Sequence, residues 1–94
     1  NGDDLYPLSV EKLDGFDLGI YPNPNNGSFN VELLGYTGVI EMQLYDLSGK
    51  IVHQDKLISM GGTMRSFQLD LKPGMYLARF NGELVNETRR IIIE

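Results

Sequence analysis

Three side chains that could act together in nucleophilic catalysis lie close in the sequence: Ser48, His53 and Asp55. Asp55 follows the only histidine by two residues, so in a β-strand both side chains point to the same face. A catalytic serine needs a histidine base, a carboxylate behind it and an oxyanion hole in one pocket. All three residues fall on one predicted hairpin, which offers no such pocket. The sequence therefore predicts a non-catalytic domain with an ordinary exposed or half-buried histidine.

Carboxylates are numerous, but their spacing is typical of solvated charges. A glycosidase pair needs a substrate cleft, for which 94 residues leave little room. Weak Ca²⁺ binding is the alternative for one N-terminal group: Asp3, Asp4, Asp14 and Asp17. That group lacks the spacing of an EF-hand, and no Gly-rich phosphate loop occurs. We expect neither a metal nor a cofactor.

Composition excludes several classes of protein. The net charge is −5, and the eight Lys and Arg residues are scattered, with Arg89-Arg90 as the sole adjacent pair. Nucleic acid and anionic membranes are therefore unexpected partners, because both need a concentrated basic patch. Cysteine is absent, which excludes disulfides, a thiolate nucleophile and cysteine-ligated metals. The length fits one small globular domain.

The segment 1–16 differs from the rest of the chain. It is polar and acidic and contains Pro7 and two glycines, which favours a linker or a partly ordered lead-in. Its apolar side chains could still dock on the domain: Leu5, Tyr6, Leu8 and Val10. Because the chain starts at Asn1 and shows no signal peptide, we expect a piece of a larger protein.

Residues 17–94 have the pattern of an all-β domain. Apolar and polar residues alternate in short runs, and Gly, Pro and Asn cluster between the runs. Strands are expected at 17–21, 28–34, 39–45, 51–57, 65–71, 75–80 and 87–93. Seven short strands at this spacing predict a small immunoglobulin-like β-sandwich of antiparallel strands.

Turn signals separate these strands. The stretch 22–27 combines two prolines with asparagine and glycine, and we favour a turn there over a rigid surface for a partner. Asp46, Gly49 and Lys50 mark a hairpin loop. Further connections are expected at 35–38, 59–64, Lys72-Pro73-Gly74 and Asn81-Gly82, the last with a longer loop over 83–86 as the alternative.

Tyr76 follows the Pro73-Gly74 turn in a pattern typical of a tyrosine corner. In that motif the tyrosine hydroxyl bonds back to upstream backbone and pins a connection between sheets. The alternative is a core-facing aromatic side chain without that hydrogen bond.

Four segments carry a resemblance when they are taken together and in order. They are Tyr21-Pro22-Asn23-Pro24 with Gly27 and Phe29-Asn30-Val31, then 44–52, then 69–76, and last Arg89-Arg90-Ile91-Ile92-Ile93-Glu94. Over residues 17–94 they resemble the C-terminal sorting domain of the type IX (Por) secretion system of Bacteroidetes. Each segment alone is weak, since Asp46 to Lys50 is an ordinary hairpin turn.

The resemblance implies a secretion address at the end of a larger cargo, such as a protease, an adhesin or a glycan-active enzyme. The cargo would enter the periplasm by a separate signal, and an outer-membrane translocon would then recognise the folded domain. A sortase-like surface protease would remove the domain as the cargo is anchored or released. The implied location is the periplasm in transit and then the cell surface or the medium.

The last six residues are the predicted recognition segment. Arg89-Arg90 precede Ile91-Ile92-Ile93, and Glu94 follows. An edge strand carries unpaired N–H and C=O groups, so a receptor could add a strand there while it reads charge and apolar side chains. The alternative is that the isoleucines close the core and the arginines are solvated, and both can hold. The same edge could form a weak homodimer.

Two other functions remain open from the sequence. One is a carbohydrate-binding or adhesion module of a secreted enzyme, which would need exposed aromatic side chains such as Tyr6, Tyr36 and Tyr45. The other is a passive spacer that supports a neighbouring domain.

Overall fold

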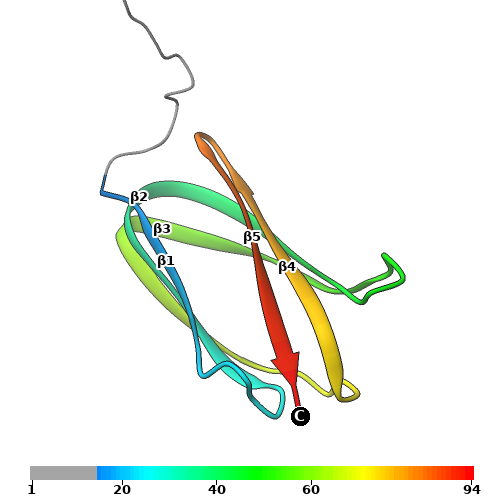
Figure 1. Ribbon diagram of the computed structural model, residues 1–94. Helices are drawn as coiled ribbons and strands as arrows, with labels where there is room; N and C mark the ends of the chain where they lie inside the picture. Colours follow the sequence, from blue (N-terminus) through cyan, green and yellow to red (C-terminus); the bar gives the residue numbers. More distant parts are fainter. Residues whose placement is uncertain (1–14) are drawn as a thin grey trace, which may run out of the picture.

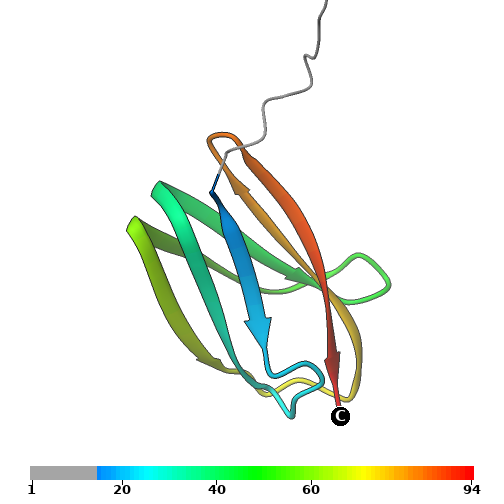
Figure 2. The ribbon, with the colours of Figure 1, turned by 60° about the vertical axis from the view of Figure 1, so that its left-hand side comes forward.

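The computed structural model describes residues 15–94, which form strands and turns. The five strands are β1 (Asp17–Tyr21), β2 (Ser28–Tyr45), β3 (Ile51–Gln68), β4 (Gly74–Gly82) and β5 (Val85–Ile93). All pair antiparallel in one sheet of order β1-β2-β4-β5, and β3 lies on the other side of β2. The sheet is curled, so that its two halves face each other across a core (Figures 1 and 2).

The all-β, sandwich-like class predicted from the sequence is confirmed, but the number of strands is five rather than seven. The expected strands 28–34 and 39–45 are two halves of β2. Likewise, 51–57 and most of 65–71 belong to β3. The lead-in expected at 1–16 lies almost entirely outside the described residues.

A β-bulge replaces the turn expected at 35–38. The register shifts between Leu34 and Thr37, so Gly35 and Tyr36 together lie opposite Gly61 of β3. One extra residue moves the alternation of a strand by one position. Accordingly, the buried positions of β2 are odd-numbered before the bulge and even-numbered after it.

The expected connection at 59–64 is instead a bend within β3, level with the bulge. Gly61 donates its backbone N–H to Thr37 Oγ1 at 2.9 Å. The buried Ser59 hydroxyl donates to the Tyr36 carbonyl at 2.7 Å. These bonds fix the place where the β2–β3 pair folds over, and the glycines there accommodate the bend.

The core fills the space between the two halves of the curled sheet. Its buried side chains come from every strand: Leu18, Phe29, Val31, Leu33, Tyr36, Ile40, Met42, Leu44, Leu57, Phe67, Tyr76, Ala78, Phe80, Val85, Ile91 and Ile93. Full burial of one large aliphatic or aromatic side chain stabilises the fold by about 1.5–3 kcal/mol. Both Ile91 and Ile93 of the last strand therefore contribute to stability.

The β4–β5 hairpin turns at Glu83-Leu84 rather than at Asn81-Gly82. Gly82 lies inside β4, where an added Cβ would lie 2.8 Å from the Tyr36 hydroxyl oxygen and 2.9 Å from Ile40 Cγ1. Because Gly82 has no Cβ, the Tyr36 and Ile40 side chains can lie close to its backbone. The turn comes after Gly82, where β4 ends.

Candidate recognition site at the last strand

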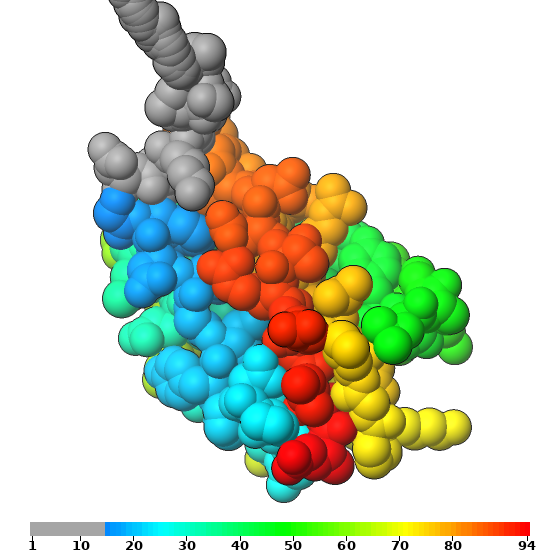
Figure 3. Space-filling model, in the orientation of Figure 1, coloured from blue at the N-terminus to red at the C-terminus, as the bar shows by residue number. Residues whose placement is uncertain are grey.

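β5 separates the predicted recognition segment into two sets of side chains. Ile91 and Ile93 point into the core, with exposed fractions of 0% and 3%. Arg90, Ile92 and Glu94 are exposed on the outer face. Because successive side chains of a strand point to opposite faces, only the second set is available to a partner in the folded domain. Figure 3 shows the surface of β5, in orange and red, open beside β4.

The two arginines differ in their surroundings. Arg89 lies on the inner side of β5, where its Nη1 contacts Glu87 Oε1 at 2.5 Å. Both residues line a groove of about 250 Å³ between β5 and β1, together with Phe16 and Leu18. The Arg89 guanidinium thus forms an ion pair with Glu87 within the domain, whereas Arg90 faces solvent on the other side of the sheet.

The loop 22–27 lies along the outer edge of β5. The Asn23 side chain donates through Nδ2 to the Arg90 carbonyl at 2.8 Å and accepts at Oδ1 from the Ile92 N–H at 2.9 Å. Asn25 donates its N–H to the Ile92 carbonyl at 3.0 Å and accepts from the Glu94 N–H at 2.8 Å. We call Asn23 and Asn25 with these four hydrogen bonds the asparagine clamp.

The clamp corrects the prediction of unpaired backbone groups on the last strand. From Arg90 to Glu94 that edge is already hydrogen bonded, with Asn25 and Ile93 in a parallel bridge. The loop closes the curled sheet at this end, as its approach to the C-terminal end of β5 shows in Figure 2. A receptor strand or a second copy would have to displace the loop to pair there.

The loop is held in shape by bonds of its own. The Asn25 side chain is buried; its Oδ1 accepts from the Gly27 N–H at 2.8 Å and its Nδ2 donates to the Pro22 carbonyl at 2.9 Å. The peptide bonds before Pro22 and Pro24 are both cis. Gly27 has φ +108°, and an added Cβ would lie 2.3 Å from the Leu69 carbonyl oxygen. The turn expected at 22–27 is present, and it also reaches β5.

The other turn residues have the structural roles that the sequence predicts. Asp46 Oδ1 accepts from the Ser48 N–H at 2.9 Å, the Ser48 hydroxyl at 2.6 Å and the Lys50 N–H at 3.0 Å. These bonds, led by the Ser48 hydroxyl, hold the pKa of Asp46 below its ordinary value. Gly49 takes φ +90° in the same turn.

The tyrosine corner is also present. The Tyr76 hydroxyl donates to the Lys72 carbonyl at 2.6 Å, across the Pro73-Gly74 turn. Gly74 takes φ +155°, and the Tyr76 ring is buried. The hydrogen bond therefore ties the β3–β4 connection to the start of β4, next to the end of β5.

A family model described as the secretion system C-terminal sorting domain matches residues 19–94. The chain belongs to this family. A search of curated proteins finds no match. As a type IX sorting domain, it serves as a signal for export of an attached cargo across the outer membrane to the cell surface or the medium. Its family is non-catalytic in general.

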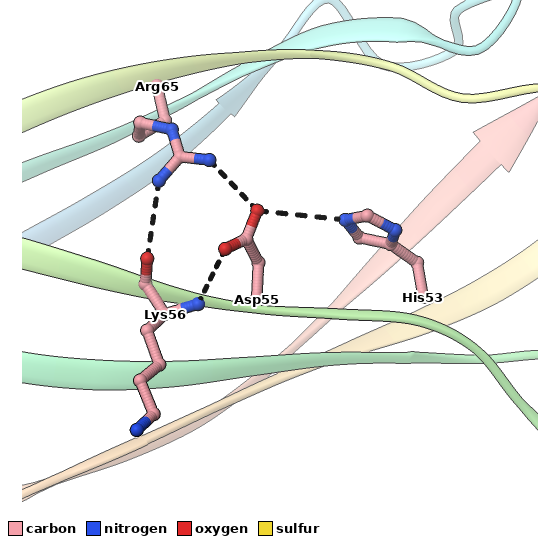
Figure 4. Close-up of polar contacts among 4 residues, drawn as sticks. All are labelled: His53, Asp55, Lys56 and Arg65. Carbon is pink, nitrogen blue, oxygen red and sulfur yellow. Dashed lines mark hydrogen bonds and ion pairs between the residues drawn. The ribbon is translucent and has the colours of Figure 1, made fainter.

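The candidate catalytic residues of the sorting domain do not form a triad. His53 Nε2 lies 3.9 Å from Asp55 Oδ2, but Ser48 is hydrogen bonded to Asp46 in the turn. The Asp55 carboxylate instead contacts Arg65 Nη2 at 2.8 Å, and Arg65 Nη1 donates to the Lys56 carbonyl at 3.2 Å (Figure 4). These contacts link the two halves of β3.

Aromatic side chains on the sorting domain give little support to a glycan site. Tyr36 is buried in the core and not exposed. The half-buried Tyr45 donates its hydroxyl to Gln43 Oε1 at 2.7 Å. Tyr6 lies outside the described residues. Within residues 15–94, no helix is long and apolar enough to span a membrane.

The asparagine clamp was not predicted from the sequence. Its bonded residues are far apart in the chain: Asn23 is 67 positions from Arg90 and 69 positions from Ile92. Its local signal was the Asn-Pro-Asn repeat itself, in which each asparagine follows a proline and can offer side-chain donors and acceptors outside a regular strand.

Proposed function

We propose that this domain carries its export address on β5 and that surface processing then separates the domain from its cargo. The observation that carries the proposal is the fixed presentation of Arg90, Ile92 and Glu94 on the outer face of β5. The partner would be a component of the outer-membrane translocon. Family membership supports the translocon as the receptor, and the exposed side chains support β5 as the surface it reads.

The fixed geometry of β5 favours recognition of a folded domain over recognition of an extended tail. β4 pairs with β5 along its length, and the clamp holds its other edge from Arg90 to Glu94. A rigid surface binds with less loss of conformational entropy than a flexible segment. Damage to the clamp should thus weaken export even where Arg90 and Ile92 are intact.

The proposed processing site lies in or before the segment 1–16. This segment is polar and acidic, and it precedes β1 at Asp17. A sortase-like protease that cuts there would leave the β-domain whole while it releases or anchors the cargo. Mass spectrometry of the released domain would place the cut, and a new terminus within β1 or β2 would contradict the proposal.

A reporter transplant tests the proposed function. Residues 1–94 are fused to the end of a reporter with an N-terminal export signal, in a Bacteroidetes host. The reporter should reach the surface or the medium only with an intact translocon, and a control reporter without residues 1–94 should stay in the periplasm. A fusion that lacks 89–94 should also stay there. A folded fusion retained in the periplasm of every strain would contradict the proposal.

A further inference from the structure

From Arg90 to Glu94, only one surface of the last strand is left for a partner in the folded domain. Ile91 and Ile93 are in the core, and the edge from Arg90 to Glu94 is occupied by the clamp. The outer face of β5 is continuous with the outer face of β4, which is its only sheet partner among the described strands. Recognition of β5 must therefore also involve β4.

Three apolar side chains gather on this outer face. Met75 lies opposite Ile92 in the β4–β5 register, and Leu77 follows Met75 by two residues on the same face. The exposed fractions are 37% for Met75, 37% for Leu77 and 39% for Ile92. Met75 and Ile92 are directly opposite, where side chains of an antiparallel pair lie about 4.5–5.5 Å apart at Cβ. Leu77 is diagonal to Ile92, at a spacing of about 7–8 Å that long side chains can span, so the three form one apolar cluster.

Two arginines border the apolar cluster. Arg90 lies opposite Leu77, and Arg79 is the next outward residue of β4 after Leu77. Both arginines are exposed. The other outward positions between Gly74 and Ile92 on the two strands are the neutral residues Asn81, Asn86 and Thr88. Glu94 adjoins Ile92 at the end of this face and adds a carboxylate there. Around Leu77, the outward charges of the two strands are those of Arg79 and Arg90, in a chain whose net charge is −5.

We propose that Met75, Leu77 and Ile92, flanked by Arg79 and Arg90, form the docking surface for a translocon protein with an apolar centre and flanking carboxylates. We call these five residues the β4–β5 face. The inference rests on the proposed function and extends it to β4. Charge complementarity defines the partner, because arginines beside a small apolar cluster select carboxylates on a matching protein surface.

An anionic membrane fits these observations less well than a protein. Each surface Lys or Arg contributes about 1 kcal/mol to binding of anionic lipid. Two arginines would therefore provide little attraction, and the net charge of −5 opposes it. A protein surface can align its carboxylates with the guanidinium groups at fixed positions.

Charge reversal in the reporter assay tests this surface. The double variant R79E/R90E should lower the amount of exported reporter about tenfold or more, which corresponds to about 1.4 kcal/mol or more of lost binding free energy. The matched control K50E/K56E makes the same change of charge at exposed positions of the β2–β3 hairpin. It should be exported like the wild type.

A second variant removes the apolar groups without a change of charge. Met75→Ser with Leu77→Ser should also reduce export, while thermal melting shows that the purified domains remain folded. Export of either folded double variant at the wild-type level would overturn the inference. If the wild-type reporter fails to leave the periplasm, the proposed function fails first, and this inference fails with it.

A vesicle measurement separates the protein partner from the membrane. The purified chain should not sediment with phosphatidylglycerol vesicles at physiological salt. Sedimentation that R79E/R90E abolishes, and K50E/K56E leaves intact, would overturn the protein docking surface in favour of a lipid one.

Discussion

The molecule has two long strands at the limits of its sheet, and their outer edges differ. The edge of β5 is hydrogen bonded by Asn23 and Asn25 from Arg90 to Glu94. β3 pairs only with β2 among the described strands, so its other edge has no strand partner over eighteen residues. Unpaired edges invite pairing with other chains, and proteins limit this in several ways. Here a loop covers one edge, while the other is bent.

β3 limits edge pairing by its shape and by inward charges. It bends at Gly61-Gly62, and Asp55 and Arg65 face each other on its concave side. Inward charged side chains and irregular strands both disfavour edge-to-edge pairing. Ile58 and Met60 nevertheless stay highly exposed, at 70% and 84%.

The difference determines which groups each strand offers to a partner. Where the backbone is already occupied, as on β5, a partner must read side chains. Where the backbone is open, as on β3, a partner could add a strand, but that edge carries no part of the predicted signal. The export address that we propose therefore lies on the strand whose edge is hydrogen bonded from Arg90 to Glu94.

Among the substitutions that test the two edges, Gly27→Ala is expected to reduce the free energy of unfolding most. An added Cβ would lie 2.3 Å from the Leu69 carbonyl oxygen at φ +108°, so the loop must move away from its place at β5. We expect a loss of about 2–4 kcal/mol in the free energy of unfolding, measured by urea denaturation.

Gly49→Ala is the matched control for that substitution. Gly49 also has a positive φ, of +90°, but nothing lies within 4 Å of an added Cβ. Only backbone strain applies, so the loss should be about 1 kcal/mol. Equal losses for the two variants would show that the contact with Leu69 does not position the loop.

A smaller loss is expected from Asn23→Ala. The substitution removes two hydrogen bonds to the backbone of β5, each worth about 0.5–1.5 kcal/mol, so unfolding should become easier by about 1–3 kcal/mol. Asn26→Ala in the same loop is the control, because within residues 15–94 the Asn26 side chain accepts only from the Ser28 N–H, at 3.3 Å. A similar loss for both variants in chemical denaturation would argue against the clamp.

On β3, Arg65→Met should reduce the free energy of unfolding by less than Gly27→Ala or Asn23→Ala. The Arg65–Asp55 pair is partly exposed, with side-chain exposures of 42% and 34%, and such pairs contribute about 0–1 kcal/mol. The methionine keeps an apolar stem near Phe67, over which the Arg65 guanidinium lies at 5.2 Å. Thermal melting measures the change in stability. A larger loss of stability for Arg65→Met than for Asn23→Ala would show that the Arg65 contacts stabilise the fold more than the Asn23 hydrogen bonds do.

The smallest effect is a pH dependence at Asp55. A hydrogen bond from the Lys56 N–H, with the charge of Arg65, holds the pKa of Asp55 below its ordinary value of 3.8. A lowered carboxyl pKa stabilises the fold above about pH 3.8, and this contribution disappears as the pH falls through the lower, folded-state pKa. The stability difference between the wild type and Asp55→Asn should therefore shrink as the pH drops below 3.8. A difference that stays constant down to about pH 2 would contradict this origin.

Sequence patterns predicted the local features well. β1 occupies the predicted residues, and the Asp46 turn and the Tyr76 hydrogen bond follow from residue types within four positions. The predicted number of strands was wrong because glycines occur both in β-bulges within strands and in turns between strands. Gly35 and Gly61-Gly62 look like loop residues, yet they bend continuous strands.

The candidate site was predictable only in part. The alternation of Ile91 to Ile93 in β5 could be expected once a strand was assigned, but not which side would be buried. The clamp depends on contacts between segments that are far apart in the chain, and no local periodicity encodes such contacts. Arg89 and Arg90 look equivalent in the sequence, and only the fold directs Arg89 to the inner side of β5, beside Glu87, and Arg90 to the outer face.

Amide hydrogen exchange by NMR tests the closed edge of β5 most directly. The N–H groups of Thr88 and Ile92 point to the same edge, but among residues 15–94 only that of Ile92 has a partner there, the Asn23 side chain. We predict that Ile92 exchanges much more slowly than Thr88. Asn23→Ala should raise the Ile92 rate toward that of Thr88, whereas Asn26→Ala should leave it unchanged. Equal rates for Ile92 and Thr88 in the wild type would show an open edge and contradict the account.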